Sequence, residues 1–315
     1  KRKCTRRQVR EYFEKHPPCR IGMEACAGAH YWAREFSRMG HDVKLIAPQF
    51  VKPYVKSQKN DANDAEAICE AVGRPNMRFV TAKTVAQQDM MAVHRIRSEL
   101  VRQRTAKANQ IRGLLTEYGV IVPVEINALR RALPEIKEDV ENGLSSLFRR
   151  LLIGLQADLI ELDRRVEQLD GEIQAAAKKD EIARRLQSIP GIGPITATAL
   201  AASVGNGRQF QHGRDLAASL GLPPGQHSSG GKDRLLGMSK RGDRYLRTLL
   251  IHGARSVSQA AANKTDPRSR WIVGVVARRH KNVAAVALAN KNARIAWALI
   301  VRGGAYDNQF GMAAA

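Results

Sequence analysis

The stretch NDANDAEAI at residues 60–68 places two aspartates at the predicted start of a helix. Asn60 is a residue type that caps helix N-termini and Gly73 is typical of a helix end, so we expect a helix over residues 61–72. Side chains three residues apart project from one helix face, so Asp61 and Asp64 can converge on one point. Converging carboxylates are tolerated best with a hard cation or a proton between them. The alternative is that both only complement the helix dipole.

Strands and helices alternate around this acidic helix. Short apolar runs bounded by Pro and Gly predict the strands, and amphipathic spacing predicts the helices. The expected elements are helices at residues 3–15, 29–39 and 50–55 and strands at residues 20–24, 42–47 and 77–80. This alternation predicts an α/β layer fold with parallel pairing, in which functional side chains gather at the carboxyl ends of strands. Glu24 ends the first strand and is followed by small residues, so it is a third candidate acid.

The middle of the chain has the periodicity of long helices. Residues 83–119 predict one helix whose basic face is either solvated or in contact with a phosphate backbone. From Leu144 to Ile173, apolar residues step by three or four with charged residues between them, which is typical of a coiled coil. We expect this seam to join two copies of the chain. The alternative is a hairpin with residues 85–119 of the same chain.

A third region opens with IPGIGP at residues 189–194, followed by predicted helices at residues 195–204 and 212–220. A glycine hairpin before a helix can grip a nucleic-acid phosphate with bare backbone amides, which makes Gly191 and Gly193 candidate contacts. The alternative is a tight turn between helices. A final, largely buried helix is expected at residues 282–302, so this region is predicted to be helical.

Residues 222–234, LPPGQHSSGGKDR, predict an exposed, mobile loop, because serines between Pro and Gly do not form a core. Ser239 is expected to cap the basic helix that follows. A loop hydroxyl beside clustered cations can attack phosphate, since the cations stabilise the developing charge. Ser-Gly loops are also common linkers, and His227 is the one obvious base nearby. The candidate nucleic-acid contacts in this region are Lys232, Arg234, Lys240, Arg241, Arg244 and Arg247.

The charge balance points to a polyanionic partner. The 315 residues include 52 Lys and Arg against 30 Asp and Glu, a net charge of +22 spread along the chain. Nucleic acid is a better match than a membrane surface, and no apolar run approaches the length of a membrane span. The four cysteines form no C-x-x-C pair, so reduced thiols are expected. We expect a cytoplasmic, nucleoid-associated protein with parts at residues 1–95, 96–182 and 183–315.

Four segments occur in an order that resembles a known family. They are IGMEAC at residues 21–26, KNDANDA at residues 59–65, IPGIGP at residues 189–194 and HSSGG at residues 227–231. Together they resemble the DEDD transposases of the insertion-sequence family called "one-ten", subgroup "eleven-eleven". The resemblance covers essentially the whole chain. It implies an α/β plus α fold: a RuvC-like (RNase H-like) domain, a coiled coil, and a helical transposase domain with a helix-hairpin-helix.

The resemblance also implies a mechanism and its residues. Members are bacterial recombinases that cut and rejoin DNA, guided by a structured RNA from the element, called bridge or seeker RNA. Glu24, Asp61 and Asp64 match the second, third and fourth acids of the DEDD set, which bind Mg²⁺. Ser228 matches the nucleophile that forms a transient phosphoserine link, and Ser229 takes this role if the loop register shifts by one. The partners implied are DNA, the guide RNA and further copies of the chain, as a dimer and as a tetramer during synapsis.

The first acid of the set has no match in the sequence. In relatives it lies on a strand, and we expect that strand upstream of residue 1, so that the native protein begins earlier. Two other functions fit the composition. One is a metal-dependent junction nuclease that uses the same acids without a covalent intermediate. The other is an architectural nucleic-acid-binding protein whose acids are ordinary helix caps.

Overall fold

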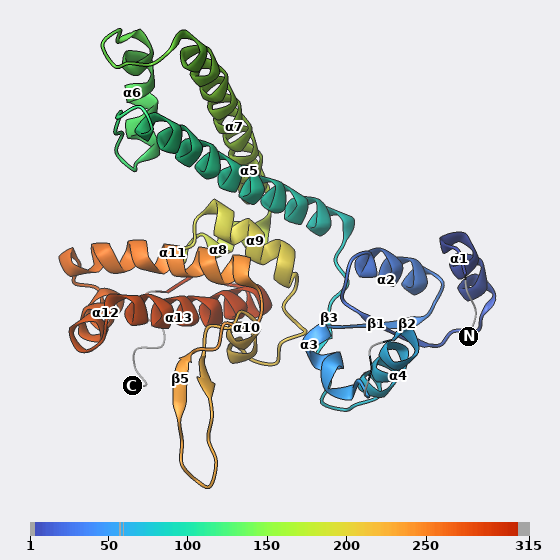
Figure 1. Cartoon of the computed structure of the whole chain (residues 1–315). Coiled ribbons are helices and arrows are strands. Elements are labelled where there is room, and N and C mark those ends of the chain that lie inside the picture. The colour runs from blue at the N-terminus through green and yellow to red at the C-terminus, as the bar shows by residue number, and fades with distance from the viewer. Residues whose placement is uncertain (1–3, 57, 59, 308–315) are drawn as a thin grey trace.

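The computed structural model describes residues 4–56, 58 and 60–307 (Figure 1). Residue 3 of the first expected helix and Lys59 of the KNDANDA motif lie outside the described residues. An N-terminal part combines a small sheet with helices, a long helical hairpin follows, and a helical C-terminal part carries a projecting β-hairpin. Within the described residues, no helix is long and apolar enough to cross a membrane.

The N-terminal sheet has three strands in the order β1-β2-β3. Strands β1 (Arg20–Glu24) and β2 (Asp42–Ile46) pair in parallel, as expected, with Glu24 opposite Ile46. Strand β3 (Phe79–Val80) pairs antiparallel to β2, so the expectation of parallel pairing is wrong for the third strand. The reason is that the chain re-enters the sheet beside Ile46, the last residue of β2, instead of beside its first residue.

Short helices surround this sheet. They are α1 (Arg6–Lys15), α2 (Ala29–Arg38), α3 (Pro48–Val51), the 3-10 helix η1 (Lys52–Tyr54) and α4 (Asp61–Val72). Helix α4 packs closely on β1 at Gly22, where an added Cβ would lie 3.0 Å from Ile68 Cγ2 and 3.1 Å from Val72 Cβ. Glycine at this position therefore brings the acidic helix against the strand that ends in Glu24.

Helices α5 (Val85–Thr116) and α7 (Ser146–Lys179) form an antiparallel hairpin, with α6 (Ile126–Glu138) at its tip (Figure 1). In α7, Leu152 and Leu159 are almost completely inaccessible and share one apolar core with residues of α5 and α6 of the same chain. Part of the predicted seam is therefore filled within the chain, as in the hairpin alternative, whereas Leu147 and Leu151 of that seam stay exposed. The expected boundary between residues 95 and 96 falls inside α5.

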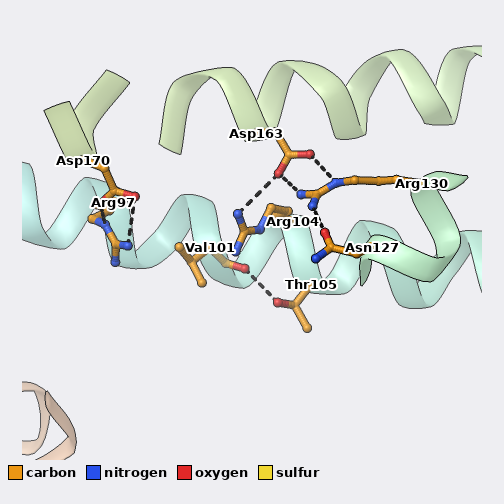
Figure 2. A network of polar contacts seen from close by, with 8 residues as sticks. All are labelled: Arg97, Val101, Arg104, Thr105, Asn127, Arg130, Asp163 and Asp170. Carbon is orange, nitrogen blue, oxygen red and sulfur yellow. Dashed lines mark hydrogen bonds and ion pairs between the residues drawn. The ribbon is translucent and has the colours of Figure 1, made fainter. Parts of the chain in front are cut away.

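Ion pairs along the hairpin fix the register of α5 against α7 (Figure 2). Arg97 pairs with Asp170, and Arg104 and Arg130 share Asp163, with Arg130 Nε 2.9 Å from Asp163 Oδ2. Much of the basic face of α5 is thus neutralised within the chain. Phosphate contact by these arginines would have to displace partly buried carboxylates.

The C-terminal part packs helices around one apolar core. Its elements are α8 (Glu181–Leu186), α9 (Pro194–Val204), α10 (Gly213–Ser219), β4 (Pro224–Gln226), β5 (Leu235–Met238), α11 (Arg244–Ala260), the 3-10 helix η2 (Ala261–Asn263), α12 (Pro267–Arg278) and α13 (Lys281–Arg302). Helix α13 lies against α10 and α11, and Leu200, Leu250 and Leu288 are fully buried between the helices. This core supports the β-hairpin that projects from it (Figure 1).

The start of α5 is tied to the α/β part. Lys83, two residues before α5, donates its backbone N–H to His30 Nδ1 at 3.2 Å, and its carbonyl accepts from Arg34 Nη1 at 2.7 Å. Both His30 and Arg34 lie on α2. Burial, together with the nearby positive charges of Lys83 and Arg34, lowers the pKa of His30 to about 4. A neutral His30 therefore accepts this bond at neutral pH.

His94 ties the same helix to the C-terminal part. Its side chain is completely buried, with Nε2 3.0 Å from Thr198 Oγ1 on α9 and Nδ1 3.1 Å from the Tyr245 hydroxyl on α11. Thr198 donates its hydroxyl proton to Pro194 O at 2.8 Å, so His94 Nε2–H must donate to Thr198 and Nδ1 must accept from Tyr245. Burial lowers the pKa of His94 to about 4, which keeps the imidazole neutral.

We expect the buried His94 to make folding stability depend on pH. Its folded pKa of about 4 lies below the unfolded value of 6.5, so the unfolded chain binds more protons between these values and stability falls as pH drops through this window. The loss from this group between pH 7 and pH 5 is about 1–2 kcal/mol. Urea unfolding of His94→Gln should show a shallower decline than the wild type over this range.

The matched control is His252→Gln, because His252 is exposed on α11. It should keep the wild-type pH dependence. Equal pH slopes for the His94 variant and the wild type would contradict the assignment of a neutral, buried imidazole.

Candidate functional site

The three candidate acids lie on two elements that pack together. Glu24 ends β1, and Asp61 and Asp64 occupy the first turn of α4. The predicted cap is confirmed: Asn60 Oδ1 accepts the Asn63 backbone N–H at 2.9 Å. Asn63 in turn donates its side-chain amide to Gln58 O at 2.6 Å, which holds the preceding turn against the helix.

Within the described part of the chain, none of these three carboxylates has a side-chain hydrogen bond or ion pair. Neighbouring acids differ in this respect: Asp42 pairs with Arg20, Glu66 with Lys56, and Glu70 with Arg74. In a chain with a net charge of +22, carboxylates without a cationic partner remain available to a ligand.

Carboxylate oxygens are the ligands that Mg²⁺ prefers, so the donor chemistry of these acids fits a divalent metal. Their arrangement does not complete a site. Among residues 4–56, 58 and 60–307, no group of three or more His, Cys, Asp or Glu side chains is placed to hold a metal ion. Glu24, Asp61 and Asp64 therefore lie on two elements that pack together, and they do not form a metal cluster by themselves.

Ser228 lies on an exposed β-hairpin, where an exposed loop was expected. Strands β4 and β5 pair antiparallel, and the turn closes with a 3.1 Å hydrogen bond from Lys232 N to Ser229 O. Gly230 and Gly231 have φ of +56° and +76°. Positive φ at both central residues is the requirement of a type I′ turn, which matches the twist of paired strands. The two glycines thus form a hairpin end instead of a flexible linker.

The Ser228 hydroxyl is exposed but has defined partners. Its Oγ accepts a 2.9 Å hydrogen bond from Gln226 Nε2 and a 3.1 Å bond from the Arg234 backbone N–H. Gln226 Nε2 also donates to Asp233 Oδ1 at 3.4 Å. Among the hydrogen bonds of the described residues, none joins the His227 imidazole to Ser228, so the expected base is not in contact with the nucleophile.

The sequence predictions overlooked Gln226 and Asp233. In a hairpin with the two-residue turn Gly230-Gly231, residues that are equally far from the turn face each other across the two strands. Ser228 therefore lies opposite Asp233. The two adjacent glycines are the signal for this turn type, and recognising it would have placed Gln226 and Asp233 near Ser228.

The base of the hairpin is fixed by close backbone packing. An added Cβ on Gly242 would lie 1.8 Å from Ser219 O, and one on Gly221 would lie 2.3 Å from Arg241 O. Lys240 N also donates to Gly221 O at 3.1 Å, and Lys240 has a positive φ of 56°. The end of α10 and the segment after β5 therefore interlock, which sets the direction in which the hairpin projects.

The basic candidates separate into exposed and buried residues. Lys232, Arg234, Lys240, Arg241 and Arg244 are exposed along the hairpin and the chain leading into α11. These positions can meet a phosphate backbone.

Arg247 was expected to contact nucleic acid, but the structure gives it a packing role. Its side chain is buried and donates from Nη1 to Leu220 O at 2.8 Å, so it fastens α11 to the end of α10. The cap of α11 is also corrected, because Asp243 accepts from Leu246 N at 3.0 Å where Ser239 was expected to cap.

The glycine turn before α9 is packed against other helices. An added Cβ on Gly191 would lie 2.9 Å from Gly253 O on α11, so Gly191 permits close helix packing. The phosphate contact expected of its backbone amide stays a prediction. Pro190 O accepts hydrogen bonds from Arg268 Nη2 at 3.0 Å and Asn292 Nδ2 at 3.2 Å. Gly193, the N-cap of α9, stays exposed with open space around it.

Comparison with known proteins matches two segments of the chain to transposase models. Residues 183–270 match the model described as "Transposase IS116/IS110/IS902 family". Residues 3–120 match the model for the DEDD transposase domain of IS110 elements, which suggests the use of a divalent metal. The first match contains the serine hairpin and the second contains the three acids.

Several curated relatives are similar over nearly their whole length. A "probable family 20 transposase" of Pseudomonas aeruginosa is 55% identical over 96% of this chain and 90% of its own. The transposase for insertion sequence element IS1111A of Coxiella burnetii is 49% identical over 95% of this chain and 83% of its own.

A third relative, the transposase for insertion sequence element IS1328 of Yersinia enterocolitica, is 46% identical over 96% of this chain and 90% of its own. Identities of this size over both the acid-bearing and the serine-bearing parts indicate a DNA transposase. The chain belongs to the IS110/IS116/IS902 family of transposases.

Proposed function

We propose that this transposase is a serine-type recombinase in which Ser228 attacks a DNA phosphodiester and forms a transient phosphoserine link. The observation that carries the proposal is the Ser228 hydroxyl itself: it is exposed on an ordered hairpin, held by two donors and followed by Lys232 and Arg234. Cationic side chains around such a hydroxyl stabilise the charge that develops on the phosphate.

The proposed chemistry is a transesterification. The bond between Ser228 Oγ and phosphorus forms as the bond from phosphorus to a deoxyribose oxygen breaks, and the serine proton ends on the released oxygen. The phosphoserine ester keeps the energy of the broken bond, so rejoining to a new DNA end needs no nucleotide cofactor.

We propose that Glu24, Asp61 and Asp64 bind Mg²⁺. Their packed elements and the absence of internal cationic partners within the described chain support this role. When bound, the metal would supply Lewis-acid stabilisation of phosphate oxygens.

The guide is proposed to be a structured RNA, as in the family that the motifs resemble. The net charge of +22 supports contact with nucleic-acid phosphates. Exposed candidates for these contacts are Gly193, Lys232, Arg234, Lys240, Arg241 and Arg244.

Paired strand exchange needs at least two copies of the chain, so we propose a dimer that pairs into a tetramer on DNA. The hairpin of α5 and α7 offers a surface for this contact. Leu147 and Leu151 are more than half exposed, and Leu114 and Tyr118 are more than a third exposed. Leu151, Leu114 and Tyr118 line one groove between the two helices, so apolar area remains after the internal seam is filled.

Asp64→Asn should reduce Mg²⁺-dependent DNA cleavage by about 100-fold or more, because an amide replaces a charged metal ligand. Cleavage of an element-end DNA is measured against Mg²⁺ concentration. Glu66→Gln is the matched control, since Glu66 is on the same helix but pairs with Lys56. Equal cleavage by both variants would indicate that the acids are ordinary helix-capping residues.

Replacing Ser228 with Ala should abolish covalent protein–DNA adducts while RNA and DNA affinity stay unchanged, because only the nucleophilic oxygen is lost. Adducts are counted on denaturing gels with labelled DNA, and Ser229→Ala serves as the control that keeps them. Persisting adducts in the Ser228 variant would overturn the assignment. Undiminished cleavage that yields only water-derived ends would instead favour the junction nuclease.

Protein purified from cells that carry the element should contain one structured RNA and at least two chains per particle. RNA sequencing identifies the nucleic acid, and light scattering gives the mass. Leu151→Arg should lower the mass toward one chain, because it puts a charge into the exposed apolar groove. Random nucleic-acid fragments would argue for an architectural protein, and a monomeric wild type on DNA would contradict the oligomer.

A further inference from the structure

We propose that Gln226 is a positioning residue for the reaction, oriented by Asp233. Together with the Arg234 backbone N–H, it forms a two-donor cradle that stabilises the Ser228 oxygen as it loses its proton. This inference rests on the proposed role of Ser228 as the nucleophile. It adds a named donor pair and the residue that orients one of them.

The orientation of the Gln226 amide follows from its two partners. Nε2 lies 3.4 Å from Asp233 Oδ1 and 2.9 Å from Ser228 Oγ. An ionised carboxylate only accepts hydrogen bonds, so the NH₂ group and not the amide oxygen must face Asp233. The same NH₂ group then has its second hydrogen for Ser228. Asp233 therefore determines that Gln226 is a donor to the nucleophile.

The second donor is part of the hairpin backbone. Arg234 N lies 3.1 Å from Ser228 Oγ, and the Arg234 carbonyl accepts from His227 N at 2.9 Å. The strand pairing that holds Arg234 therefore also holds its N–H toward the serine. Such a donor needs little reorganisation when charge develops, which is the property that makes backbone amides effective in oxyanion sites.

The number of lone pairs on the oxygen explains why two donors suit this step. A serine hydroxyl has two lone pairs, and both are used by Gln226 and Arg234 in the free protein. Loss of the proton creates a third lone pair, which is free to attack phosphorus while both hydrogen bonds remain. In the rejoining step the oxygen leaves with the same charge, so the same donors stabilise it again.

Both bonds are exposed to water in the free protein, because the hairpin residues are exposed. Water competes for the same donors and weakens each bond. DNA lying across the hairpin would exclude that water, and hydrogen bonds to a developing charge are stronger in a dry site. The cradle is therefore expected to act in the DNA complex more than in the free chain.

The test is a pair of variants, Gln226→Glu alone and Gln226→Glu with Asp233→Asn. The double variant keeps the wild-type net charge and can restore a hydrogen bond between positions 226 and 233 with donor and acceptor exchanged. It still presents a carboxylate to Ser228, which cannot donate. We expect both to form adducts about 100-fold more slowly at saturating DNA, with unchanged DNA affinity.

Two controls separate the cradle from other effects. Gln211→Glu adds the same charge at an exposed position before α10 and should keep the wild-type rate. Hydrogen exchange of the His227 amide reports whether the hairpin stays paired in each variant. Asp233→Asn alone should form adducts about tenfold more slowly, because the new asparagine side chain can donate as well as accept and no longer requires Gln226 to present its NH₂ group.

Recovery of the wild-type rate in the double variant would overturn the inference, because it would show that the 226–233 bond only stabilises the hairpin. A wild-type rate in Gln226→Glu would overturn it as well. If adducts vanish with Ser228→Ala in either case, the proposed function stands without the cradle. If adducts persist in Ser228→Ala, the proposed function fails and the inference fails with it.

Discussion

The hydrogen bonds of the buried His94 are the constraint on which the arrangement of the chain depends. Helix α5 is held to the α/β part through Lys83, His30 and Arg34, and to the C-terminal part through His94, Thr198 and Tyr245. The same helix continues into the hairpin with α7. One helix therefore connects the acid-bearing sheet, the hairpin and the serine-bearing part, and the neutral His94 imidazole joins that helix to the serine-bearing part.

The candidate acids and the candidate serine are held by two different kinds of structure. The acids lie on elements brought together by the absence of a side chain at Gly22, whereas Ser228 projects on a narrow hairpin whose base is locked by Gly221 and Gly242. The described residues form no complete metal cluster, while the serine oxygen already has its two donors. The serine oxygen thus has defined hydrogen-bond partners in the free chain, whereas the carboxylates of the described residues are not gathered around one point.

Local sequence rules predicted the helices and strands well. The way in which these elements pack depends on contacts between distant segments and was predicted less well. The cap at Asn60 and the stop at Gly73 gave the bounds of α4, because both act within one turn. The direction of β3 and the packing of α7 on α5 depend on contacts between segments that are distant in sequence. The local spacing of apolar residues does not specify such contacts. The candidate acids and the candidate serine were chosen from motifs and stay predictions, whereas the packing roles of Gly191 and Arg247 depend on neighbours far away in sequence.

We propose that the transposase joins itself to DNA through one serine of the β-hairpin. The most direct measurement is to trap the protein–DNA adduct, digest both components, and locate the remaining nucleotide by peptide mass spectrometry. We expect a nucleotide on Ser228 within the peptide that spans the Gly230-Gly231 turn. A nucleotide on another residue, or cleaved DNA with no modified peptide, would contradict it.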